Sequence, residues 1–123
     1  CLRKVGCQFV RLLQDPEAIA IFRVIIAEAV NSPHVATLFY QAGPEASLST
    51  LSDVIEKFGE GSLSRDIAQQ LAVDYCALLK GEYHTMMLCG IQSPLQDEAI
   101  TAHVNSAAEK ILLLFNHYTQ QRN

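Results

Sequence analysis

The sequence lacks both a long apolar run and a cluster of basic residues. Unbroken apolar stretches such as 24–27 and 111–115 are far shorter than the ~20 residues of a membrane-spanning helix. Lys and Arg together number 9 among 123 residues, the formal net charge is −4, and Arg3-Lys4 is the one adjacent basic pair. Binding of nucleic-acid phosphates or of an anionic membrane surface needs a basic stripe or cluster. We therefore expect a soluble chain that holds neither DNA nor a membrane by itself.

Motifs for metal binding and for catalysis are also missing. The four histidines, His34, His84, His103 and His117, show no His-Glu-x-x-His spacing, and the cysteines form no Cys-x-x-Cys pair. Glu82 and His84 are two residues apart on a predicted helix and therefore point in different directions. We expect no metal, no cofactor and no catalytic residue.

The chain contains four cysteines, Cys1, Cys7, Cys76 and Cys89, in a context that is half hydrophobic and shows no secretory signal. This context is typical of reduced thiols in the cytoplasm. We expect Cys76 and Cys89 to behave as small hydrophobic residues, while a redox-sensing role for Cys7 or Cys89 stays open. Because the amphipathic pattern begins at once after Cys1, we interpret the chain as a fragment, whose first helix is expected to be partly exposed.

Helix-breaking residues divide the chain into six segments, and no segment alternates apolar and polar residues as a strand would. Asp15-Pro16 offers a capping side chain followed by a proline in the first turn. Gly43-Pro44 is predicted to end one helix and start another, and Ser93 begins a segment with capping-box spacing. The sequence predicts an all-α bundle with helices at about 2–13, 17–30, 34–42, 45–58, 65–89 and 95–119.

With 123 residues, the chain is expected to form one domain over residues 1–123. The segment 17–30 is apolar nearly all round, so we expect it to run through the middle of that domain. Its Glu28 is expected to form a salt bridge within the core with Arg11 or Arg23, and pairing with a cationic ligand is the alternative.

The last two segments, 65–89 and 95–119, are apolar over a broader surface than one core-facing stripe needs. We expect two long antiparallel helices that meet a second copy of the chain in a four-helix bundle across a two-fold axis. The alternative is that both broad faces pack within one chain. Gly81 is expected to allow close helix approach at the dimer seam rather than to mark a hinge. The predicted dimer interface comprises Leu71, Leu78, Gly81, Val104, Ala108, Ile111 and Phe115.

Aromatic and methionine side chains at helical spacing, with a few polar groups among them, indicate a small-molecule pocket. Such side chains are often plain core, and we expect about half of the candidates to touch a ligand. Tyr40, Tyr75 and His84 are expected to orient polar groups of that ligand. The candidate set is Phe22, Ile26, Phe39, Tyr40, Tyr75, His84 and Met87.

Three stretches are distinctive: 22–29 (Phe-Arg-Val-Ile-Ile-Ala-Glu-Ala) with Pro33, 38–44 (Leu-Phe-Tyr-Gln-Ala-Gly-Pro) and 78–84 (Leu-Leu-Lys-Gly-Glu-Tyr-His). Together they resemble the C-terminal domain of TetR-family repressors, in particular the AefR-like branch. The resemblance covers essentially the whole chain, and the sequence departs from it at Asn31-Ser32 and at Glu45.

This resemblance implies a homodimer whose last two helices form the interface and whose earlier helices enclose a pocket for a small apolar or amphipathic effector. Effector binding would respace two helix-turn-helix heads, which belong to the parent protein and are absent from this chain. Operator DNA would then be released, because half-sites lie about one helical turn apart. The expected function is effector sensing and homodimerisation in a bacterial transcriptional repressor. The alternative is a standalone helical interaction module that recruits a different protein.

Overall fold

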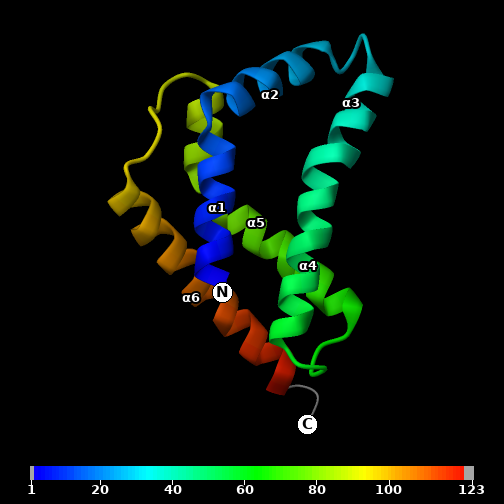
Figure 1. Cartoon of the computed structure of the whole chain (residues 1–123), viewed down its shortest axis with the longest axis vertical. Helices are drawn as coiled ribbons and strands as arrows, with labels where there is room; N and C mark the ends of the chain where they lie inside the picture. Colours follow the sequence, from blue (N-terminus) through cyan, green and yellow to red (C-terminus); the bar gives the residue numbers. More distant parts are fainter. Residues whose placement is uncertain (1, 121–123) are drawn as a thin grey trace.

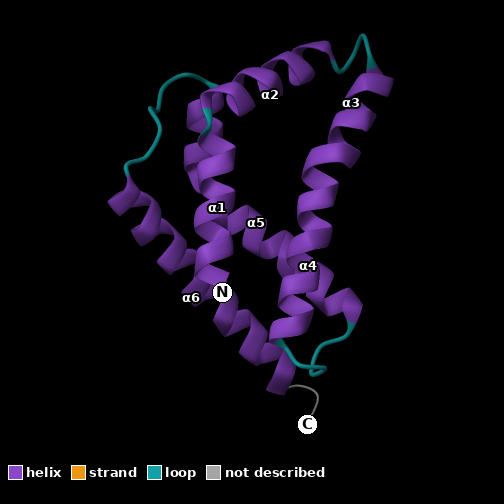
Figure 2. Cartoon of the chain, viewed as in Figure 1, coloured by secondary structure: helices purple, strands orange, loops and turns teal. Residues whose placement is uncertain are grey.

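The computed structural model describes residues 2–120, and this range contains helices and no strand (Figure 1, Figure 2). Its α-helices are α1 (Leu2–Gln14), α2 (Pro16–Glu28), α3 (Pro33–Tyr40), α4 (Ala46–Phe58), α5 (Arg65–Leu88) and α6 (Asp97–Gln120). A π-helical segment, η1 (Gln41–Glu45), joins α3 to α4. The all-α prediction is confirmed, and each predicted boundary lies within one or two residues of the observed one.

α5 is the central helix, and it contacts α1, α2, α4 and α6. In Figure 1, α1 and α6 lie on one side of the molecule, while α3, η1 and α4 form a continuous rod on the other. α2 contacts both α1 and α3 and bridges the two sides at one end. The most extended loop is the segment 89–96 between α5 and α6 (Figure 2).

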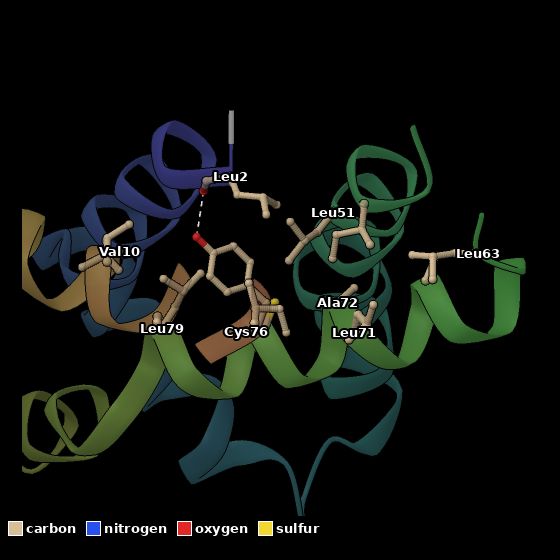
Figure 3. Close-up of a cluster of buried hydrophobic side chains, with 14 of the residues drawn as sticks. Leu2, Val10, Leu51, Leu63, Leu71, Ala72, Cys76 and Leu79 are labelled. Carbon is tan, nitrogen blue, oxygen red and sulfur yellow. Dashed lines mark hydrogen bonds between the residues drawn. The ribbon is translucent and has the colours of Figure 1, made fainter. Parts of the chain in front are cut away.

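The hydrophobic core lies where α5 meets α1, α4 and α6 (Figure 3). α5 presents Leu71, Tyr75 and Leu79 at i, i+4 spacing, and all three are buried. The Tyr75 hydroxyl donates a 2.7 Å hydrogen bond to the backbone carbonyl of Leu2, which satisfies the buried phenol oxygen (Figure 3). Further buried members of the core are Val10 from α1, Leu51 and Ile55 from α4, and Ile100, Val104 and Ile111 from α6. Among the apolar residues of α1, Leu12 is the one that is largely exposed.

The cap predicted at Asp15 is confirmed. Its carboxylate accepts hydrogen bonds from the backbone amides of Glu17 and Ala18, at 2.9 and 3.3 Å, and Pro16 follows in the first turn of α2. These bonds satisfy two amides that have no partner inside the helix. The local sequence therefore explains where α2 begins.

The capping box predicted at Ser93 is wrong, because α6 begins only at Asp97. The segment before α6 is held instead by Gln14 of α1. The backbone amide of Leu95 donates to Gln14 Oε1 at 2.9 Å, and Gln14 Nε2 donates to the Leu95 carbonyl at 3.1 Å. This reciprocal pair ties the amide and the carbonyl of Leu95 to α1, whereas a capping box would have satisfied two backbone amides within its own segment.

Gly43 and Pro44 do not separate two helices as predicted. The π-helical turn carries right-handed helical backbone from Tyr40 to Ala46, so that α3 and α4 form one rod (Figure 1). Proline cannot donate to the carbonyl four residues before it, and its ring would clash there in a regular α-helix. The wider π-helical turn is where this chain accommodates Pro44.

α2 does not run through the middle of the domain as predicted. Among its residues Ile19 is the one that is buried, and Ile26 is 55% exposed. Val30, just beyond the helix, is 90% exposed. Because α2 spans the end of the bundle between α1 and α3, only one of its sides has neighbours in the described chain.

The ion pair predicted for Glu28 is also wrong, since Glu28 is exposed. Arg23 turns instead to the end of α5, where its guanidinium donates to the carbonyls of Leu88 and Met87 at 2.9 and 2.8 Å. Arg11 lies 3.8 Å from Asp97. A cation at a helix C-terminus binds carbonyls that have no partner within the helix, so Arg23 ties α2 to α5.

α5 is kinked at Gly81, whose backbone angles, φ 49° and ψ −152°, are not helical. The close approach to another helix that was expected of Gly81 occurs within this chain, and its place at a dimer seam stays a prediction. The kink lies against α6: a Cβ on Gly81 would be 3.1 Å from His103 Cε1. His103 Nε2 lies 2.7 Å from the Leu79 carbonyl, and it must carry the ring proton there because a carbonyl only accepts. A histidine on α6 thus satisfies a carbonyl beside the break.

Candidate ligand pocket

A cavity of about 370 Å³ lies between α1, α2, α3, η1, α4 and α5. This volume is within the ~300–1,000 Å³ range of pockets for small molecules. Most of the lining is apolar. The lining residues are Phe9, Leu12 and Leu13 of α1, Ala18, Ile21 and Phe22 of α2, Phe39 and Tyr40 of α3, Gly43 and Pro44 of η1, Ser47 and Leu48 of α4, and Cys76, Lys80 and His84 of α5.

Four of the seven predicted pocket residues line this cavity: Phe22, Phe39, Tyr40 and His84. Their rings form a connected group, in which Phe22 meets Phe39 edge-on at 5.8 Å and meets His84 edge-on at 5.4 Å. Edge-on contacts place the positive rim of one ring against the negative face of another. One wall of the cavity is thereby built from α2, α3 and α5 together.

The other three predicted residues, Ile26, Tyr75 and Met87, lie outside the cavity. Ile26 is on the exposed side of α2, and Tyr75 is buried in the core with its hydroxyl bonded to Leu2. Met87 is buried on α5 beyond the kink at Gly81. His84 and Met87 both follow this kink, so helical spacing alone does not show which of them lines the cavity.

Sequence reasoning missed the contribution of α1 and the single charged residue in the wall. Phe9, Leu12 and Leu13 sit in a strongly amphipathic helix, a pattern that indicates a covered face without saying whether core or cavity covers it. Lys80 offered a signal: it is a lone cation four residues from Cys76, hence on the same helical face ahead of the kink at Gly81.

The cavity changes the acidity of two of its own side chains. Burial raises the pKa of the Cys76 thiol, and the positive charge of Lys80 partly opposes that rise. Burial, and secondly the charge of Lys80, lower the pKa of His84 below its ordinary value of 6.5. Near neutral pH the wall of α5 therefore presents a neutral thiol, an ammonium and a neutral imidazole to the cavity.

We expect His84 to make the domain less stable in mild acid. Its folded-state pKa is depressed, so below about pH 6.5 the unfolded chain takes up the proton more readily and stability falls with pH. Above that pH both states hold a neutral ring and no stability is lost. Urea unfolding of the wild type and of His84→Gln, at neutral pH and at pH 5.5, should show a smaller acid loss in the variant.

The matched control for this comparison is His34→Gln, at an exposed position on α3. Its acid loss should equal that of the wild type. Equal losses for His84→Gln and the wild type would show that the ring at position 84 is as easily protonated in the folded chain as in the unfolded chain.

The residues expected at a dimer interface lie in three environments. Leu71, Val104, Ala108 and Ile111 are buried within this chain, Leu78 and Phe115 are half-buried, and Gly81 is exposed. The ring of Phe115 packs edge-on against Phe58 of α4 at 5.2 Å. The first four side chains have no free surface to offer a second subunit, so an interface on α5 and α6 would have to use other residues.

Three further features of the described residues concern a metal site, a membrane span and a disulfide. Within residues 2–120, no group of three or more His, Cys, Asp or Glu side chains is placed to hold a metal ion. None of the described helices has the combined length and apolar character that crossing a bilayer requires. Cys7, Cys76 and Cys89 are free thiols, and Cys1 lies outside the described residues.

Comparison with known proteins agrees with this architecture. Residues 1–117 match the family model described as AefR-like transcriptional repressor, C-terminal domain. No curated protein and no solved structure matches the chain. Since the match extends over nearly the whole sequence, the chain belongs to the family of C-terminal domains of AefR-like transcriptional repressors within the TetR-type regulators.

Proposed function

We propose that this chain is the effector-sensing and homodimerisation domain of a TetR-type repressor, and that the 370 Å³ cavity binds a small apolar or amphipathic effector. The cavity carries the proposal, because it combines apolar walls with a few polar groups from several helices, as small-molecule sites do. The membership of the chain in the family of repressor C-terminal domains supports the same function.

A ligand in the cavity would act on α1, which contributes Phe9, Leu12 and Leu13 to the wall. α1 also packs against α5 and α6, so a change in its position changes its packing on both. In the parent protein the DNA-binding head precedes α1, and a shift of α1 would respace two such heads on the operator. The ratio of effector affinities for the two conformations sets how far DNA binding is weakened.

The dimer would use the outward faces of α5 and α6. Val73 is 48% exposed and is followed one turn later by the exposed Ala77. Leu113 of α6 is 71% exposed and lies about three turns from the exposed Ala102 on the same face. Small and apolar residues on two helices suit close packing against the same helices of a second copy.

Solution mass measured over a range of concentrations tests the dimer. We expect about twice the 13.6 kDa of one chain, and a monomer for Leu113→Glu with unchanged helical circular dichroism. Ile111→Glu is unsuitable, since Ile111 is buried and a charge there would unfold the chain. Val30→Glu, at the exposed end of α2, is the matched control and should stay dimeric.

A second candidate function is that of an interaction module for a different protein. It is favoured by exposed apolar side chains along α2, α3 and the turn between them, among them Val24, Val30, Val35 and Leu38. A strict monomer at every concentration would favour this candidate over the dimer. Self-association abolished by Val30→Glu but not by Leu113→Glu would move the interface to the α2–α3 end.

A further inference from the structure

The cavity wall on α5 carries three polar groups. Cys76 and Lys80 are four residues apart on one face of the helix, and His84, which follows the kink at Gly81, lines the same cavity. The charge of Lys80 acts on both neighbours: it opposes the rise that burial gives the pKa of Cys76, and after burial it adds to the lowering of the pKa of His84. Lys80 is half-buried as a residue and lines the apolar cavity.

The charge of Lys80 has no ion-pair partner among residues 2–120. Among the described residues that line the cavity, Lys80 alone is formally charged, and none is Asp or Glu. The ion pairs within residues 2–120 join Arg11 to Asp97 and Arg65 to Asp53 and to Glu56, so none of them uses Lys80. An ammonium partly removed from water costs free energy unless an anion or hydrogen-bond acceptors compensate it.

The remaining lining of the cavity suits the apolar part of a ligand. Phe9, Leu13, Phe22, Phe39 and Leu48 converge on it from α1, α2, α3 and α4. None of these side chains offers a hydrogen bond, so a ligand that enters must bury hydrocarbon against them. The hydroxyls of Tyr40 and Ser47 also line the cavity but carry no charge, so Lys80 sets where a charged end of such a ligand lies.

We propose that the effector is a carboxylate-bearing amphiphile, with its carboxylate on the Lys80 ammonium and its hydrocarbon part among the phenylalanine and leucine side chains. This inference rests on the proposed function, since it names the ligand class of the same cavity. A single ammonium matches a single negative charge, and an oppositely charged partner gives the stronger type of hydrogen bond. Cationic ligands of the same shape are rejected by repulsion from Lys80.

Three probes of equal chain length test the proposal on the 123-residue chain: decanoate, 1-decanol and decylamine, each below its micelle concentration. Binding is measured by isothermal titration calorimetry at neutral pH. Decanoate is expected to bind about tenfold or more tightly than decanol, as follows from the free energy of a charge-assisted hydrogen bond. Decylamine is expected to bind more weakly than decanol.

Substitutions separate the charge from the cavity. Lys80→Met keeps the length of the side chain and removes its charge, so decanoate should fall to the affinity of decanol while decanol is unchanged. Lys80→Arg should retain the preference for decanoate. Lys57→Met, at an exposed position of α4 that does not line the cavity, is the matched control and should leave all three affinities unchanged. Ser47→Phe places a ring in the cavity and should weaken all three probes.

The outcomes distinguish the two proposals. Equal binding of decanoate and decanol to the wild type would overturn the assignment of Lys80 and leave the ligand cavity standing. Loss of decanol and decanoate alike in Lys80→Met, with unchanged circular dichroism, would make Lys80 a structural residue and overturn the assignment too. If no probe bound the folded wild type, or if Ser47→Phe bound all three as well as the wild type, the cavity itself would fail as the effector site.

Discussion

Replacing Tyr75 by Ala should lower the free energy of unfolding by about 3–5 kcal/mol, the usual cost of deleting a buried aromatic ring. Tyr75 has no exposed surface and lies at the centre of the core between α1, α5 and α6. Its loss would leave a cavity and would also remove the hydrogen bond from the Tyr75 hydroxyl to the Leu2 carbonyl. Since domains of this kind are stable by ~5–15 kcal/mol, the variant loses a large share of the total.

Urea unfolding followed by circular dichroism measures this loss, with Tyr40→Ala as the matched control. Tyr40 is 50% exposed, so its truncation should cost well under half as much. Tyr75→Phe keeps the ring and removes only the hydrogen bond, and a loss of about 0.5–1.5 kcal/mol is expected. A Tyr75→Ala chain as stable as Tyr40→Ala would mean that the core does not close around this ring.

Tyr75 should also make the stability of the domain depend on pH in the alkaline range. Burial raises the pKa of Tyr75 from 10.0 to about 12, so the folded chain holds the phenol proton more tightly than the unfolded chain does. The stability that this provides is complete below pH 10 and is lost as the pH rises toward 12. Over that range the wild type should lose more stability than Tyr75→Phe.

Gly6→Ala should destabilise the domain, although alanine is the better helix former. Gly6 is buried where α1 crosses α5 and α6, and a Cβ there would lie 2.6 Å from the Tyr75 hydroxyl oxygen and 2.8 Å from Val104 Cγ1. Overpacking a core costs about 1–3 kcal/mol, and Tyr75 cannot move away without losing its bond to Leu2. That cost outweighs the ~1 kcal/mol of helix propensity gained.

Gly43→Ala is the matched control for this second prediction. A Cβ on Gly43 would meet nothing within 4 Å, and its backbone already has a right-handed helical conformation. The free energy of unfolding should therefore stay the same or rise by up to ~1 kcal/mol. Opposite signs for the two glycine substitutions in thermal or urea unfolding are the expected result. A stabilising Gly6→Ala would contradict the close approach of α1 to Tyr75.

Local signals were sufficient for the helices themselves. The Asp15-Pro16 pair predicted the start of α2, and the observed cap uses the predicted carboxylate. The same reasoning failed at Ser93, where Gln14 of a distant helix holds the backbone of Leu95. A capping pattern indicates which hydrogen bonds the residues of one segment can form with one another. It does not show whether a side chain from another helix competes for the same backbone groups.

The residues of the candidate pocket were predicted only in part, because a local pattern does not show which helices a side chain faces. A mixture of aromatic and polar side chains marked Phe22, Phe39, Tyr40 and His84 correctly as cavity-lining residues. The same pattern could not separate Tyr40 from Tyr75, because both are tyrosines on amphipathic helices. Their difference comes from the neighbours: Tyr75 faces α1 across the core, whereas Tyr40 borders the space between α3 and α2.

Two features depended on tertiary structure alone. The kink at Gly81 redirects the end of α5, and the long rod of α3, η1 and α4 runs through Pro44 instead of ending there. Glycine and proline permit a break without requiring one. Contacts such as that of His103 with the Leu79 carbonyl stabilise one of the permitted backbones.

The sequence by itself determined the number, type and approximate limits of the helices, and it excluded a basic stripe for DNA, because propensity, caps and charge are properties of neighbouring residues. Only the tertiary structure decided which apolar faces are core, cavity or free surface. Periodicity marks a face as apolar but does not name what covers it, since that depends on helices distant in the chain. This is why α2, expected in the middle, lies across the end of the bundle, and why Lys80 becomes the one charge in an apolar chamber.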